Sequence, residues 1–216
     1  QKVPATPGQP VKKPMHFPLK IALFDRDTGT HGGEITLNIT KASESFSFDG
    51  FAKAPVLSAN RGFSAPIQLE TETSDADLKF LAAKDDDSFA RYEALQQLET
   101  RELLGAVDMG PNEARRAAIA EAMGAIIDDA AIDDMMRGEL LMLPAINFLI
   151  ELAAPADPLA LHNARERLKA YLGTRLRDRL TALHDRASRV AFSLDADSRG
   201  ARKVKTQALI LLAGLL

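Results

Sequence analysis

The sequence has no cysteine among its 216 residues. Disulfide bonds and thiolate metal sites are therefore excluded, and a reducing compartment is compatible with the composition. Long hydrophobic runs are also missing. The longest, residues 208–216, covers about half of the roughly 20 residues that a membrane-spanning helix needs. The first 20 residues are rich in Pro and Lys and lack the apolar segment of a secretory signal. We therefore expect no membrane partner and a cytoplasmic protein.

An excess of charge of one sign is absent too. The 27 basic and 30 acidic residues give a formal net charge of -3, and no basic stripe is interleaved with aromatic residues. We therefore expect no nucleic-acid partner. The hydrophobic share of 46% and the charged share of 26% are typical of a globular protein. The length suits one large domain or two modest ones.

The ends of the chain are unusual for a complete protein. It begins with Gln1 instead of Met and stops within the apolar run at residues 208–216. We interpret the sequence as a piece of a longer protein, truncated at its C-terminus.

The region before residue 67 contains seven of the eleven prolines and six of the thirteen glycines. Apolar residues alternate there with polar ones, which is typical of strands that have one face in a core. Turn residues separate these rows at 25–29, 49–50 and 60–62. We predict an antiparallel sandwich over residues 1–72. Its apolar rows are Leu19, Ile21 and Leu23; Ile35, Leu37 and Ile39, continued by Phe46 and Phe48; and Ile67 with Leu69.

After Thr73 the apolar residues follow the period of a helix. We predict an all-α bundle or the start of an α-solenoid over residues 73–216, and an α+β class for the whole chain. The expected helices start at Ser74, at Asp86, at Pro111, at Asp157-Pro158 (the longest) and near Asp197.

A zinc peptidase site requires two imidazoles on one helix face, as in HExxH, and a third ligand. No two of the four histidines lie within ten residues of each other. His162 and His184 could share the long helix, but about 22 residues would separate them by roughly 33 Å. We interpret His16, His31, His162 and His184 as surface or capping residues, and we predict no metal ligand in this chain.

Several acidic groups resemble cation sites. The loops at 25–29 and 195–200 begin like EF-hand loops, but Thr36 and Thr206 stand where the bidentate Glu is needed. A hairpin turn explains the first loop. We interpret residues 85–87 as a capping cluster and Asp128, Asp129, Asp133 and Asp134 as a solvated connection.

The run at residues 62–66 resembles a nucleophile elbow around Ser64 only superficially. Pro66 replaces the final Gly, and no helix follows. P-loop and GxGxxG motifs are absent. We therefore predict no catalytic residue in this chain and assign no substrate-binding residue.

Several runs in order are similar to the bacterial branch of the zinc aminopeptidase N family. The first, Met15 to Leu19 and Ile21 to Asp25, resembles the entry to the third domain of that family. Arg61 to Pro66 resembles the rest of that domain. Leu78 to Leu81, with Phe89, Arg91, Tyr92 and Glu93, resembles the opening of the helical domain, and Leu143-Pro144 and Asp157-Pro158 continue in register.

The resemblance implies an immunoglobulin-like sandwich that acts as a spacer, followed by the first helices of a domain that limits access to the active site. It implies a zinc-dependent parent enzyme that removes N-terminal residues from peptides, with the zinc held outside this segment. The implied partners are the catalytic domain and the remaining C-terminal helices. Self-association through Leu209, Ile210, Leu212 and Leu216 is expected if those helices are missing.

Two alternatives stay open at this point. The helical half could be a free-standing module that binds a peptide or a protein without enzyme activity. The chain could also be a small hydrolase whose site is not recognisable from motifs. An upstream HExxH in the reading frame would favour the peptidase segment, and a start codon just before Gln1 would favour the module.

Overall fold

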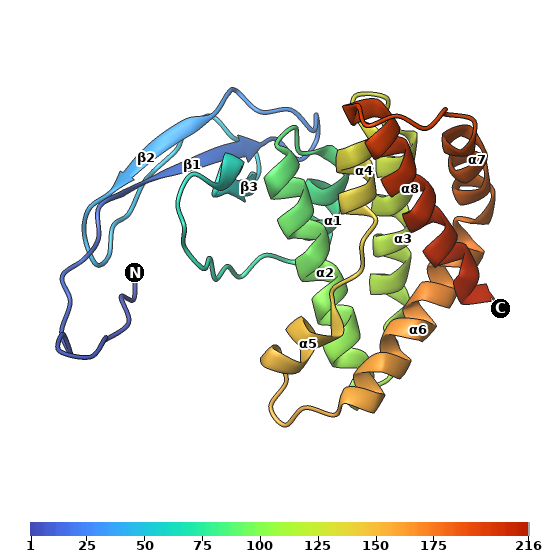
Figure 1. Ribbon diagram of the computed structural model, residues 1–216. Coiled ribbons are helices and arrows are strands. Elements are labelled where there is room, and N and C mark those ends of the chain that lie inside the picture. Colours follow the sequence, from blue (N-terminus) through green and yellow to red (C-terminus); the bar gives the residue numbers. More distant parts are fainter. Residues whose placement is uncertain (216) are drawn as a thin grey trace. The chain divides into compact units, whose positions relative to one another are not determined.

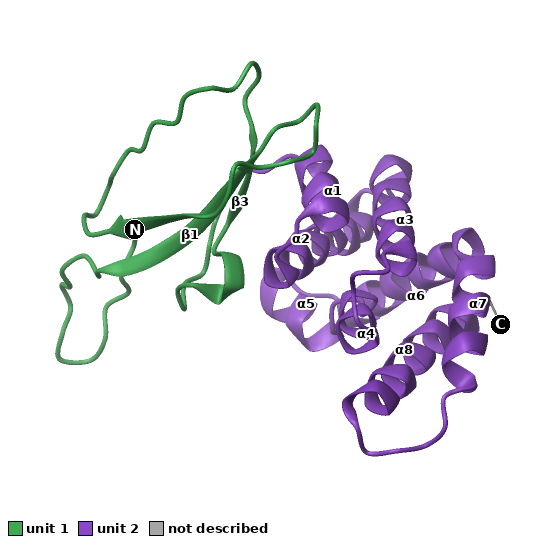
Figure 2. Cartoon of the chain, turned by 90° about the horizontal axis from the view of Figure 1, so that it is seen from above, with its two compact units in different colours: residues 1–72 green, residues 73–216 purple. Residues whose placement is uncertain are grey.

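The structure, a computed structural model, describes residues 1–215 and consists of two compact units, Gln1–Glu72 and Thr73–Leu216 (Figure 2). The strands belong to the first unit and the α-helices to the second (Figure 1). The predicted α+β class is confirmed.

Unit 1 contains a three-stranded antiparallel sheet in the order β2-β1-β3. The strands are β1 (Phe17–Phe24), β2 (Ile35–Ile39) and β3 (Val56–Ala59), followed by a 3-10 turn, η1 (Arg61–Phe63). The apolar rows of the two predicted strands face each other, because Leu19 pairs with Leu37 and Ile21 with Ile35. The buried end of the sheet is formed by Ile21, Phe24 and Val56, each at most 3% exposed.

Two strands predicted from alternation are wrong. No strand forms at Phe46 and Phe48, which are 44% and 38% exposed, or at residues 67–69. The unpredicted strand β3 instead pairs with β1. Its inward positions are Val56 and Ser58, while Leu57 is 44% exposed. A serine on the buried side hides the period-two pattern that identifies a half-buried strand. The described part of unit 1 therefore has one small sheet instead of two facing sheets.

Unit 2 contains eight α-helices and a final 3-10 turn in the described part of the chain. Six of the helices begin with a side chain that accepts a hydrogen bond from the amide three residues on, as helix caps do. Those caps are Ser74, Asp87, Asn112, Asp133, Asp157 and Asp195. The elements are α1 (Asp75–Lys84), α2 (Ser88–Asp108), α3 (Glu113–Asp128), α4 (Asp134–Leu140), α5 (Ile146–Leu152), α6 (Pro158–Arg175), α7 (Arg177–Ser188), α8 (Ala196–Leu212) and η2 (Ala213–Leu215).

Several helix limits differ from those predicted. Pro111 lies outside α3, which is capped by Asn112. The helices α4 and α5 were not predicted, because each has only seven residues and a helical period of apolar residues cannot be recognised over so short a segment. The predicted longest helix is divided at Leu176 (φ -110, ψ 11) into α6 and α7. Leu172, Leu176 and Leu180 are all buried, so the apolar stripe continues across the break and conceals it.

Helix α8 is central to the packing of unit 2. It lies between α4 and α7 (Figure 1) and also contacts α6. Its inward residues Ala201, Val204, Ala208 and Leu211 are at most 3% exposed. Glycines on both helices permit the close approach of α4. A Cβ on Gly200 would lie 2.9 Å from the backbone nitrogen of Met135, and one on Gly138 would meet Lys203.

None of the helices in residues 1–215 combines the length and apolarity that a bilayer crossing requires.

Candidate functional site

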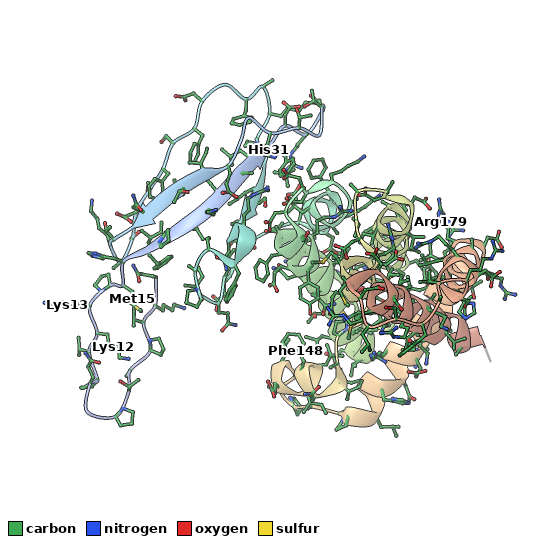
Figure 3. The ribbon with its side chains drawn as sticks, turned by 45° about the horizontal axis from the view of Figure 1, so that its top comes forward. Lys12, Lys13, Met15, His31, Phe148 and Arg179 are labelled. Atoms are coloured by element: carbon green, nitrogen blue, oxygen red, sulfur yellow. The ribbon has the colours of Figure 1, made fainter. Side chains whose placement is uncertain are left out.

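A groove with a volume of about 1090 Å³ lies in unit 2, between the end of α3, α4, α7 and the first turns of α8. Apolar side chains such as Met135, Leu183 and Val190 form part of its lining. The charged lining residues are Asp128, Asp133, Asp134, Glu139 and Asp197, with Arg137, Arg179 (labelled in Figure 3), Arg186 and Arg199. Five acidic and four basic side chains leave the groove without a strong preference for an anion or a cation.

Asp134 joins α4 to α7 at this groove. Its carboxylate accepts hydrogen bonds from Arg137 and, at 2.7 and 3.0 Å, from Nη2 and Nη1 of Arg186 on α7. Partial burial acts to raise the pKa of Asp134, but Arg186 and Arg137 together hold that pKa below its usual value. The side chain is only 16% exposed. It therefore stays ionised and fixes the start of α4 against α7.

The interpretation as a solvated connection thus holds for the exposed Asp128 and Asp133 and is wrong for Asp129 and Asp134, whose partly buried side chains are paired with arginines. Asp129 pairs with the buried Arg91 at 2.9 Å, and Asp128 pairs with Arg179 at 2.8 Å. Asp133 caps α4. The partners are far away in sequence, so a local pattern of carboxylates could not reveal them. The segment ties the end of α3 and the start of α4 to α2 and α7, and in the described residues it forms no carboxylate group that could hold a metal ion.

A second polar cluster joins α2 to α3. Glu102 is 1% exposed, and its Oε1 lies 2.8 Å from Nε of Arg116. The guanidinium of Arg116 also lies over the ring of Tyr171, 5.7 Å from its centroid. On the outer side, Asp75 pairs with Arg101 at 3.0 Å and with Arg115 at 2.7 Å. These pairs hold α1, α2 and α3 together, and Nη2 of Arg116 is buried without a hydrogen-bond partner.

A role for Glu99 or Glu102 was not predicted from the sequence. Both are buried among the apolar residues of α2, at 0% and 1% exposure. The sequence contained a signal for them, because Glu99 lies four residues after Leu95 and Glu102 four residues after Leu98, on the inward face of the helix. A charged residue inside an apolar stripe indicates a buried polar cluster.

The histidines do not converge. His16 precedes β1, and His31 packs on Phe24 with ring centroids 4.7 Å apart and accepts a hydrogen bond from the amide of Gly33. His162 is on α6 and His184 on α7, so they do not share one helix. Within residues 1–215, no group of three or more His, Asp or Glu residues is placed to hold a metal ion.

The two EF-hand-like loops have structural roles. Oδ1 of Asp25 accepts hydrogen bonds from the amides of Asp27 and Thr28 at 3.0 and 2.8 Å, which closes the turn after β1. Asp195 caps α8 by accepting from the amide of Ser198 at 2.7 Å. In the cluster at 85–87, Asp87 caps α2 as predicted.

Ser64 is part of a tight connection. Its hydroxyl lies 3.2 Å from Oδ1 of Asn60 and accepts a hydrogen bond from the amide of Lys20 at 2.9 Å. The side chain of Asn60 also bonds the amide and the carbonyl of Ala65. With its hydroxyl engaged in these contacts, Ser64 is not positioned as an activated nucleophile.

Both units match known domain families. Residues 1–72 match a domain of unknown function, DUF3458, described as an Ig-like fold. Residues 75–215 match its companion, DUF3458_C, described as ARM repeats.

The chain belongs to the DUF3458_C family.

Curated relatives connect this DUF3458_C chain with aminopeptidase N. It is 31% identical to aminopeptidase N of Escherichia coli (strain K12) over 223 residues, which covers 99% of the chain and 26% of the relative. It is 37% identical to aminopeptidase N of Caulobacter vibrioides over 174 residues, covering 80% of the chain and 20% of the relative. The resemblance to the aminopeptidase N family is thereby confirmed. The chain spans about a quarter of the length of these relatives.

A solved structure shares the fold. The crystal structure of Legionella pneumophila aminopeptidase A in complex with aspartic acid matches with a TM-score of 0.82 and 24% identity. The match covers 93% of the DUF3458_C chain and 24% of the other chain.

Proposed function

We propose that this chain is a noncatalytic segment of a zinc-dependent aminopeptidase N, an enzyme that removes N-terminal residues from peptides. The observation that carries the proposal is the match to aminopeptidase N over 99% of the chain. The Ig-like unit acts as a spacer, and the helical unit forms part of the cap that limits access to the active site. The partners are the catalytic domain and further helices of the same enzyme, in the cytoplasm of a bacterial cell.

The zinc belongs to the parent enzyme, because the residues of this chain do not fit a zinc site. His16 and His31 belong to unit 1, and His162 and His184 lie on separate helices. A catalytic zinc needs three convergent protein ligands. The chain therefore contributes no ligand and no step of the hydrolysis.

The charged pairs of unit 2 support a role as a rigid cap. Asp134, Glu102 and Asp129 each join two or more helices, and the arginine partner is itself buried in the last two cases. A wall that excludes folded proteins must keep its shape while short peptides enter. These long-range pairs provide that stiffness.

The first test uses the purified chain and the gene around it. We expect no hydrolysis of an alanyl amide, no stoichiometric zinc by metal analysis, and an HExxH motif with a distal Glu upstream in the same reading frame. One zinc per chain with chelator-sensitive hydrolysis would contradict the proposal. A start codon directly before Gln1 with no upstream peptidase motif would favour the binding module.

The cap role is tested in the longer enzyme. Substituting Asp134→Asn loosens the contact of α4 with α7 but touches no zinc ligand. We expect the rate on an alanyl amide to stay unchanged and the rate on long unfolded polypeptides to rise relative to it. An unchanged ratio would contradict the cap role and leave the peptidase assignment standing.

A further inference from the structure

The connection between α4 and α5, residues 141–145, is tied to two other helices by side chains. Nε2 of Gln96 on α2 donates to the carbonyl oxygen of Met142 at 2.8 Å. Nε of Arg165 on α6 donates to the carbonyl oxygen of Pro144 at 2.9 Å. Each bond satisfies a backbone carbonyl that follows the end of α4, so the two side chains hold the connection in place.

The carboxyl of Glu99 interacts with both of these side chains, Gln96 and Arg165. It is 0% exposed. Its Oε2 accepts a hydrogen bond from Nε2 of Gln96 at 3.2 Å, and its Oε1 has no hydrogen-bond partner among the described residues. Burial raises the pKa of Glu99 well above its usual value, and the charge of Arg165 opposes that rise.

The other ionisable groups around Glu99 do not supply a second counter-charge. Burial raises the pKa of Tyr92, which is on the same helix. The negative charges of Glu93, Glu139 and Glu99 raise that pKa further. Glu139 on α4 pairs with Lys203 of α8. Glu102, one turn after Glu99, pairs with Arg116 of α3. In residues 1–215, Arg165 is the cation whose charge acts on Glu99.

Helix α5 depends on this connection because its own packing is slight. Leu149 is its one fully buried residue among seven, and Phe148 (Figure 3) and Leu152 are 45% and 46% exposed. A seven-residue helix is unstable by itself, so tertiary contacts must hold it.

We propose that Glu99 acts with Gln96 and Arg165 as a proton-dependent clasp on the α4–α5 connection. While Glu99 is protonated, its neutral carboxyl is tolerated in the core and Arg165 stays on the carbonyl of Pro144. When the proton leaves to solvent, Oε1 carries charge without a donor, and Arg165 turns from Pro144 toward it. The connection and α5 then loosen. The clasp lies within the helical unit and does not depend on the peptidase role.

The direction of the pH dependence follows from the linkage between proton binding and closing of the clasp. The closed clasp binds the proton more tightly than the open one, so its stability is fully present at low pH. That stability is lost as the pH rises from the ordinary value of a glutamate toward the raised one. One proton is involved, which limits the change to about tenfold in the opening equilibrium per pH unit.

Hydrogen exchange of the α5 amides in the full chain tests the clasp. Between about pH 5 and pH 9, after correction for base-catalysed intrinsic exchange, we expect α5 protection to fall by up to about tenfold per unit. Glu99→Gln should remove this dependence. The control Glu121→Gln, at a side chain on α3 that is 61% exposed, should keep it. Constant protection in the unaltered chain, or an unchanged slope in Glu99→Gln, would overturn the clasp.

A second measurement needs no variant. The side-chain carboxyl carbon of Glu99, followed by NMR, should still report the protonated form at a pH above the ordinary pKa of a glutamate. Its titration should coincide with the loss of α5 protection. Titration of Glu99 at the ordinary pKa of a glutamate, or without any response of α5, would overturn the proposal.

Discussion

Gly200 lies where α8 passes close to the backbone of α4. A methyl group there would lie 2.9 Å from the backbone nitrogen of Met135, which cannot move without shifting α4. We expect Gly200→Ala to lower the free energy of unfolding by about 1–3 kcal/mol through overpacking. The gain in helix propensity offsets up to about 1 kcal/mol of this loss.

Gly124 on α3 provides the matched control for thermal unfolding. A Cβ there would have no neighbour closer than 3.6 Å, which is ordinary contact. Gly124→Ala should therefore raise the midpoint slightly, while Gly200→Ala lowers it. Equal midpoints for the two variants would show that the α4–α8 approach is not tight.

The buried pair of Glu102 and Arg116 should show strong coupling. Removing the carboxylate in Glu102→Met leaves Arg116, which is 6% exposed, without its 2.8 Å partner. We expect a loss of about 3–5 kcal/mol for this single change. The double variant Glu102→Met with Arg116→Met should recover most of the loss, because no uncompensated charge remains. Urea denaturation of Glu102→Met, Arg116→Met and the double variant measures this coupling. Additive losses of stability would refute it.

At the scale of elements, Asp134 makes the α4–α7 contact depend on acidity. Its pKa is held below the usual value by Arg186 and Arg137, against the opposing effect of partial burial. Its contribution to stability is therefore complete above the ordinary pKa of an aspartate and is lost as the pH falls through the lowered one. We expect Asp134→Asn to cost about 1.5–3 kcal/mol near neutral pH, as for hydrogen bonds to a charged group.

Thermal unfolding from about pH 6 down to pH 2 checks this sign. The difference between the unaltered chain and Asp134→Asn should shrink as the carboxylate of the former becomes protonated. The control Asp128→Asn removes the pair with Arg179, in which both side chains are about half exposed at 54% and 52%. Such exposed pairs contribute no more than about 1 kcal/mol. A constant difference over the whole pH range would contradict the role of Asp134.

At the scale of the whole molecule, the apolar end of α8 bears on association. Ala208 and Leu211 are buried, but Leu209 and Ile210 are 54% and 41% exposed. Leu212 is half-buried, and Leu216, also expected in this surface, lies outside the described residues. One face of the helix thus packs inward and the other stays uncovered. This follows from the sequence, because the end of α8 is apolar on nearly all sides and cannot bury every face.

We predict that the purified chain self-associates through Leu209 and Ile210, which should appear as a mass that rises with concentration in light scattering. Replacing both with Gln should give a monomer, because each buried side chain of this size contributes about 1.5–3 kcal/mol. Leu159→Gln, at a site 69% exposed on α6, is the control and should associate as before. Removing α8 altogether is unsuitable, since it packs against α4, α6 and α7. A strictly monomeric unaltered chain would contradict the prediction.

Much of the chain's organisation could be predicted because its causes are local. Cap residues such as Ser74 and Asp157 bond amides three residues away, so a short stretch of sequence contains both partners. The apolar rows of β1 and β2 share a period of two for the same reason. The scattered histidines likewise allowed the absence of a zinc motif to be recognised from spacing alone.

The sequence by itself thus determined the α+β class, most helix starts and the likeness to aminopeptidase N, since these depend on neighbours within a few residues or on motifs in order. The tertiary structure alone decided the rest. Ser58 faces inward because β3 pairs with β1, the break at Leu176 interrupts no apolar stripe, and Asp134 meets an arginine 52 residues away. The buried carboxyl of Glu99 acquires its properties from α6 and the α4–α5 connection. Such partners meet only in the folded chain, because burial and charge act through space and not along the sequence.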